Sequence, residues 1–337
     1  MVNMLKLSSL FLIVAASFFS IFQYSAAQDH PKTLTLGMVA PLTGDFAPYG
    51  EHIQRGVELG VDELTKRNIH ARLVAEDACL PIQVRSALIK LTSQDKISAL
   101  VASYCVIGMV AAAPILEKSK TIGFQTSGGT KEILEAGDFL FTTASKTKDE
   151  AIALANSAYK DLGLRKAAVL YLTTQWGEEF SQAFGDQFRR LGGIITGTST
   201  NPIGQNTFRS ELTKLRSGNP DTLLIVHLSS TLGIALKEAR GIGFKGRFIA
   251  TSDAEEDSVL KEAGNDAEDL LLLAPEAGVE TEQMKSFDTK FRTKFHRTPH
   301  PLSRHAYDAT VLAGTALFEC KLDSNCAKSS RRTWWRR

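Results

Sequence analysis

The 337-residue chain is 43% hydrophobic, so it can bury a large core and has the length for two. Its formal net charge is +2. Residues 1–27 contribute one positive charge, from a lysine, and the last seven residues contribute four, from arginines, so residues 28–330 carry −3. A mildly acidic body gives no reason to expect a nucleic acid as a partner.

The N-terminal segment has the pattern of a secretory signal peptide. Lys6 precedes an apolar run from Leu7 to Phe22, and small residues stand at Ser25 and Ala27. We therefore expect residues 1–27 to be removed and the mature protein to be exported, soluble and periplasmic. A membrane anchor is the alternative, although the run is close to the shortest length that spans a bilayer.

The chain then alternates between strand and helix patterns. A first set has strands at about 33–40, 71–77, 97–103 and 121–125, with helices at about 49–67, after Pro81 and at about 106–119. A second set begins near 147 with a helix and has strands at about 166–172, 194–200, 221–227 and 247–251, separated by helices at about 176–191, 207–216 and 231–240. This alternation predicts an α/β protein with parallel sheets and right-handed crossovers.

Two such sets predict two Rossmann-like lobes. We interpret the apolar runs 139–144 and 270–274 as crossings between the lobes, followed by helices at about 282–295 and 303–318 that return to the first lobe. Residues 28–143 and 273–328 would then form lobe I, and residues 144–272 lobe II. Two lobes joined by extended crossings can hinge about a cleft. The basic tail 329–337 has no periodicity and is interpreted as a truncated or aberrant end, with contact to a membrane surface as the alternative.

Five strands run out into glycines, hydroxyls, aromatic rings or acids. These exits are 41–50, 103–105, 125–130, 173–176 and 251–253. Ligands of open parallel sheets bind outside the carboxyl ends of the strands, so the site is expected there. The exits offer hydrogen-bonding groups and rings but no evident catalytic set, which favours a binding protein over an enzyme.

Four cysteines in an exported chain are expected to pair. Cys79 and Cys105 each lie near the carboxyl end of a strand, and neighbouring parallel strands could bring them together, which leaves Cys320 and Cys326 for a small local loop. A metal site is the alternative, but the spacings fit no zinc pattern. We expect no metal and no cofactor.

Three other patterns suggest chemistry without completing it. The glycines of Gly241–Gly246 match GxGxxG, but they follow a helix and precede a strand, so they indicate a helix stop. His296, His300 and His305 are close in sequence, yet two prolines separate them from a common helical face, so a solvated loop is favoured over a metal site. His227 beside Ser229 and Ser230 leaves an exported α/β hydrolase as a further hypothesis.

Several segments together resemble periplasmic amino-acid-binding proteins of the Leu/Ile/Val type. They are 40–50, 76–79 with 103–105, 124–130, 175–178, 239–244 and 306–310, in the family's order over about residues 33–328. The resemblance implies a type I periplasmic binding protein fold with a hinged cleft between lobes. It also implies a monomer that captures a small ligand and delivers it to an inner-membrane ABC permease.

The resemblance implies particular site residues. The ligand carboxylate would be held at Val106, Gly128 and Thr130, and the ligand ammonium by Asp253, for which a helix N-cap is the alternative. Aromatic walls fall on Tyr49 and on Trp176, which could instead be a core residue, and a further pocket position falls near Leu228. The family's lobe-one disulfide matches the Cys79–Cys105 pair.

One departure bears on the ligand. Val106 stands where amino-acid binders commonly place a hydroxyl, and one such contact is worth on the order of 1 kcal/mol. We therefore expect an amino acid with an apolar side chain above all, with an aromatic acid, an amide or another small carboxylate as alternatives. A periplasmic sensor of the same fold remains the alternative to a transport protein.

Overall fold

The computed structural model describes residues 33–273 and 281–329. The predicted signal peptide and residues 330–337 of the tail lie outside these ranges. Within them, no helix combines the length and the apolar character needed to cross a bilayer.

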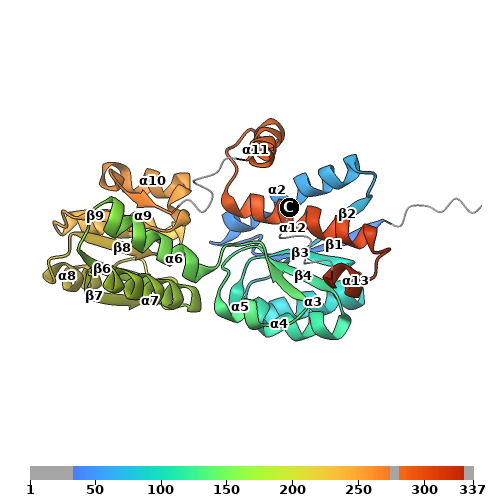
Figure 1. Cartoon of the computed structure of the whole chain (residues 1–337), viewed down its shortest axis with the longest axis horizontal. Coiled ribbons are helices and arrows are strands. Elements are labelled where there is room, and N and C mark those ends of the chain that lie inside the picture. Colours follow the sequence, from blue (N-terminus) through green and yellow to red (C-terminus); the bar gives the residue numbers. More distant parts are fainter. Residues whose placement is uncertain (1–32, 274–280, 330–337) are drawn as a thin grey trace, which may run out of the picture. The chain divides into compact units, whose positions relative to one another are not determined.

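The first sheet has five parallel strands in the order β2-β1-β3-β4-β5. The strands are β1 (Leu34–Ala40), β2 (Ala71–Asp77), β3 (Ala99–Ser103), β4 (Ile122–Gln125) and β5 (Leu140–Thr142). Every residue of β1 and β3 is buried, as expected for central strands that helices cover on both faces. Figure 1 shows α2 (Ala47–Lys66) and α12 (Pro301–Glu319) on one face, and α3 (Pro81–Ser93) and α4 (Val106–Ser119) on the other.

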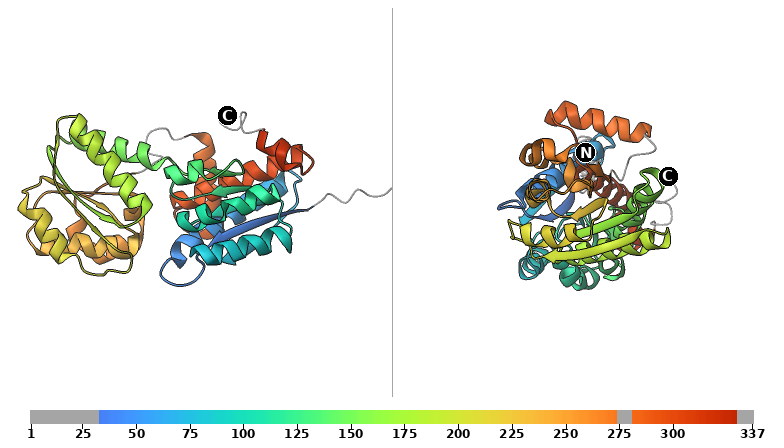
Figure 2. Two further views of the ribbon diagram at one scale, coloured as in Figure 1. Left: turned by 90° about the horizontal axis from the view of Figure 1, so that it is seen from below. Right: turned by 90° about the vertical axis from the view of Figure 1, so that its left-hand side faces the viewer.

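The second sheet also has five parallel strands, in the order β10-β9-β8-β6-β7. They are β6 (Lys166–Leu172), β7 (Ile194–Asn201), β8 (Thr222–Val226), β9 (Arg247–Ala250) and β10 (Leu271–Leu272). Helices α6 (Thr147–Asn156), α7 (Gln175–Arg190), α8 (Arg209–Ser217), α9 (Ser229–Gly241) and α10 (Asp257–Ala263) surround them, and Figure 2 shows helices on both sides of the strands.

Alternating residues of β6 pack into two different cores, one on each face of the second sheet. Ala168 and Leu170 pack into the cluster that contains residues of α8 and α9, whereas Ala167 and Val169 pack into the cluster that contains residues of α6 and α7. Successive side chains of a strand point to opposite faces, so a continuous apolar run can serve both cores. The predicted α/β class with two Rossmann-like parallel sheets is therefore confirmed.

The last helices pack against elements of the first sheet. Gly56 and Gly60 of α2 lie against α12 so closely that a Cβ at Gly56 would stand 2.2 Å from the carbonyl oxygen of Ser303. Helix α11 (Glu282–Phe295) brings Phe287 and Phe291 onto Leu59 of α2. This contact agrees with the predicted return of the chain to lobe I, while the lobe boundaries and the hinge stay predictions.

Some elements differ from the expectation. The two runs interpreted as crossings contribute the edge strands β5 and β10, which pair with β4 and β9. The short helices α5 (Lys131–Glu135), α10 and α13 (Ser324–Ser329) were not predicted, since they have too few residues for a helical period to show. The GxGxxG glycines do end a helix: α9 stops at Gly241, Gly243 has φ +85°, and β9 begins at Arg247.

Candidate functional site

A cavity of about 410 Å³ lies at the carboxyl ends of strands from both sheets. This volume is within the range of small-molecule sites. All five predicted exit segments contribute to its lining, through Phe46 and Tyr49, Tyr104 and Cys105, Ser127 and Gly128, 173–176, and 251–253. The cavity therefore lies where parallel-sheet geometry predicted the site.

Six of the seven predicted ligand-binding residues line this cavity. They are Tyr49, Val106, Gly128, Trp176, Leu228 and Asp253. Thr130 does not line it: its side chain is fully buried at the residue before α5, and its Oγ1 has no hydrogen-bond partner among the described residues. Gly128 adopts φ +54°, a backbone conformation that favours glycine. The roles of these residues in ligand binding stay predictions.

Both predicted disulfides are present, with Cα–Cα distances of 5.2 Å for Cys79–Cys105 and 5.7 Å for Cys320–Cys326. The reasoning that placed the first pair on neighbouring strands was wrong, because β1 lies between β2 and β3 in the sheet. The bond instead joins the segments that follow two strands on either side of β1. Cys79 and Cys105 both line the cavity.

Tyr49 connects a helix of the first sheet with strand exits of the second. Its hydroxyl donates to Oδ1 of Asp253 at 2.9 Å, and it accepts from the backbone N–H of Ser229 at 2.8 Å. Because the single hydroxyl proton goes to the carboxylate, the hydroxyl of Ser229, 2.8 Å away, donates to Tyr49. The ring stacks on Tyr104 at 5.0 Å between centroids, and burial raises the pKa of Tyr49 far above its ordinary range.

Asp253 is held by two hydroxyl groups. Its carboxylate accepts from Tyr49 and, at 2.9 Å, from Oγ1 of Thr251. It caps no helix, since α10 has Glu256 at its N-cap and no side-chain capping bond. Burial raises the pKa of Asp253 to about 6, so the group is ionised at neutral pH but at a cost. A cationic ligand group would offset that cost.

Glu150 is a lining residue that the sequence did not reveal. It lies in the first turn of α6, four residues past the segment that follows β5. Burial, with the nearby charge of Asp253 as a smaller contribution, raises the pKa of Glu150 to about 8. The only sequence signal was an acidic residue in a first turn, which is common on helices that bind nothing.

The histidines of the region do not form the metal site considered from sequence. His300 gathers instead with His52 and Glu256, and the ligand atoms of the three lie within 4.8 Å of one another. Nδ1 of His300 accepts from the backbone N–H of Leu302 at 3.2 Å, so the proton of the neutral ring is on Nε2, which faces Glu256 at 3.6 Å. Nε2 of His52 faces the same carboxylate at 2.8 Å and must donate to it. Nδ1 of His300 is already occupied by that backbone N–H, so a metal at its Nε2 would have to displace the last ring proton, and the trio fits two rings that face one carboxylate.

The hydrolase hypothesis finds no support at His227. This ring is fully buried, lies edge-on to Phe208 at 5.0 Å and has its Nδ1 3.2 Å from Oγ1 of Thr231. Burial lowers the pKa of His227 to about 4. The hydroxyl of Ser229 is bonded to Tyr49 instead, so no nucleophile–base pair forms with it.

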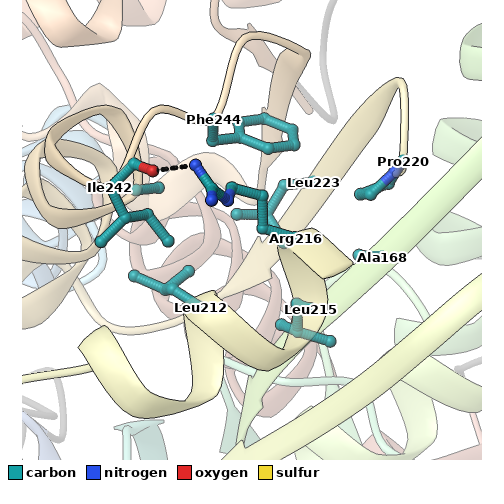
Figure 3. A pocket seen from close by; sticks show the side chains of 9 residues that line it. Ala168, Leu212, Leu215, Arg216, Pro220, Leu223, Ile242 and Phe244 are labelled. Atoms are coloured by element: carbon teal, nitrogen blue, oxygen red, sulfur yellow. Dashed lines mark hydrogen bonds between the residues drawn. The ribbon is translucent and has the colours of Figure 1, made fainter. Parts of the chain in front are cut away.

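A second, smaller hollow lies between α8, α9 and the second sheet (Figure 3). Its lining is mostly aliphatic, and Arg216 donates across it to the carbonyl oxygen of Ile242. It has no room for a water molecule. We regard it as a packing defect of the core, not a site.

The family model described as periplasmic binding protein matches residues 33–327. The chain belongs to the periplasmic binding protein family. Its fold agrees with that of the branched-chain amino acid transporter substrate binding protein LivJ from Streptococcus pneumoniae, in complex with isoleucine, at TM-score 0.78 and 20% identity over 88% of this chain and 87% of that one. It agrees equally with a solute binding protein of an ABC transporter from Rhodopseudomonas palustris, in complex with 3,4-dihydroxybenzoic acid, at TM-score 0.78 and 21% identity over 88% and 84%.

Among curated members of the family, a leucine-, isoleucine-, valine-, threonine- and alanine-binding protein of Pseudomonas aeruginosa is 23% identical over 318 residues, which are 91% of this chain and 83% of that protein. An amino acid binding protein of the same organism is 22% identical over 237 residues, or 68% of this chain. The match spans 63% of the length of that second relative. The family is thus one of solute-binding proteins, and the ligand of this member has to be argued from its own cavity.

Proposed function

We propose that this protein is an extracytoplasmic solute-binding protein that captures a small amino acid with an apolar side chain and delivers it to an ABC importer. After removal of residues 1–27 it would work as a periplasmic monomer. Family membership and the relatives that bind amino acids support the class of function. The cavity at the strand ends supplies a place for the ligand.

The observation that carries the proposal is the half-buried carboxylate of Asp253 in the cavity wall. It is held by two hydroxyl groups and has no lysine or arginine beside it in the described lining. A carboxylate in that position suits an ammonium group, with which it makes a charge-assisted hydrogen bond. Apolar and aromatic residues, including Trp176 and Leu228, complete the lining and suit an apolar side chain.

Closure of two lobes is the mechanism we propose for capture. The hydroxyl of Tyr49 on α2 bonds to groups that follow β8 and β9, so this hydrogen-bonded set requires both sheets. A ligand whose ammonium binds Asp253 would favour the arrangement in which these groups meet. The population of the closed form then rises to an extent set by how much more tightly the ligand binds the closed form than the open form.

The test is calorimetric titration of the mature protein with a panel of L-amino acids and with benzoate. We expect at least one amino acid to bind and Asp253→Asn to weaken it by tenfold or more, because a charge-assisted hydrogen bond contributes about 1.5–3 kcal/mol. Asp257→Asn is the matched control, since Asp257 lies nearby, is exposed and does not line the cavity. Binding of benzoate alone, or equal affinity of both variants for an amino acid, would refute the ammonium role.

A further inference from the structure

The cavity contains a second acidic side chain besides Asp253. Glu150 reaches it from α6, whereas Asp253 follows β9, so the two carboxyl groups come from different elements of the wall. Burial raises the pKa of both groups, and the charge of Asp253 adds to the rise for Glu150. The described lining therefore holds two acids within electrostatic reach of one another.

No described lining residue supplies a compensating positive charge. The lining includes no lysine and no arginine, and its two histidines are His300 and His305. Burial lowers the pKa of His300 to about 3 and that of His305 to about 4, so both rings are neutral at pH 7. Any positive charge opposite these acids has to come with the ligand.

The positions that the resemblance implies for a ligand carboxylate offer few side-chain donors. Val106 provides no hydroxyl, and the hydroxyl of Thr130 is buried away from the lining. The hydroxyl of Ser127 lines the cavity but donates to the carbonyl oxygen of Tyr104. These three positions thus bring no free side-chain donor to the cavity, whereas Asp253 and Glu150 bring acceptors for cations.

We propose that Glu150 is a second anchor for the ligand, so that the site takes molecules with two basic nitrogens joined by an apolar chain, such as a diamino acid or a diamine. This inference rests on the proposed function and refines its apolar side chain to one that ends in a second nitrogen. The first nitrogen binds at Asp253, and the apolar chain lies against the apolar lining, where Ile107, Leu228 and Leu302 contribute. The raised pKa of Glu150 fits this role. With a pKa of about 8 the carboxyl group is mostly protonated at pH 7, and a ligand cation beside it favours the ionised form.

The experiment compares ligands that differ by one group. L-Lysine and L-norleucine have the same carbon chain, and only lysine carries a terminal ammonium. We expect the wild-type protein to bind L-lysine, L-ornithine or cadaverine at least tenfold more tightly than L-norleucine or L-leucine in calorimetric titration. This comparison requires no variant.

Glu150→Gln keeps the shape of the side chain and removes its charge. It should abolish the preference for the second nitrogen, whereas Asp149→Asn, at the exposed neighbour on α6, should retain that preference. Tighter binding of leucine or norleucine than of lysine, or an unchanged preference in Glu150→Gln, would overturn the second anchor and leave the proposed function standing. Failure of every amino acid and diamine to bind would overturn the proposed function as well.

Discussion

Asp253→Asn should stabilise the ligand-free protein at neutral pH although it weakens ligand binding. The pKa of Asp253 is raised from its ordinary 3.8 to about 6 by burial. Asparagine has nearly the same shape: its amide oxygen can accept from Tyr49, and its amide nitrogen can donate to the hydroxyl of Thr251. The substitution thus removes the buried charge and keeps the hydrogen bonds.

The sign of the pH dependence follows from where the proton is held. Below pH 3.8 Asp253 is protonated in both the folded and the unfolded chain, so its charge costs nothing. Between pH 3.8 and about 6 the unfolded chain loses the proton while the folded chain keeps it, and the free energy of unfolding falls as the pH rises. Above pH 6 the cost is complete, and a difference of about 2 between the two pKa values corresponds to about 3 kcal/mol.

Urea unfolding followed by circular dichroism between pH 4 and pH 8 measures this cost. The variant and the wild type should have nearly equal free energies of unfolding at pH 4, and above pH 6 the variant should be more stable by up to about 3 kcal/mol. Asp257→Asn should show no such divergence. A variant that is less stable than the wild type above pH 6, or a difference that does not change with pH, would refute the assignment of a burial cost to this carboxylate.

Two further outcomes follow from contacts in the structure. Tyr49→Phe should weaken ligand binding in calorimetric titration by about tenfold, because the donors of Ser229 lose their acceptor, which costs about 1–2 kcal/mol. Tyr104→Phe keeps the stacked ring and serves as the control. Equal affinities of both variants would contradict the bridging role of Tyr49. The double variant Cys79→Ser, Cys105→Ser should lose about 3–4 kcal/mol of the free energy of unfolding measured in urea, because the bond closes a loop with a sequence separation of 26. A loss below about 1 kcal/mol would mean that the bond constrains the unfolded chain little.

The sequence alone determined the class of the fold and the edge at which the site lies. Alternating strand and helix patterns predict parallel sheets, and in parallel sheets all carboxyl ends meet at one edge. Polar and aromatic residues at the strand exits, such as Tyr49, Trp176 and Asp253, therefore point to one place before any coordinates are known. Disulfide pairing was also accessible, because four cysteines in an exported chain leave few choices.

Only the tertiary structure decided which of these side chains face the cavity. Thr130 belongs to the same strand exit as Gly128, yet its buried side chain does not line the cavity. Glu150 lies on a helix and is part of no sequence motif, yet it reaches the lining. The hydroxyl of Tyr49 meets Asp253 across a separation of 204 residues, and β1 separates the two strands that precede Cys79 and Cys105. Local periodicity predicts the elements because the side-chain repeat of a helix or a strand is a local property, whereas side-chain partners depend on strand order and helix packing that join distant segments.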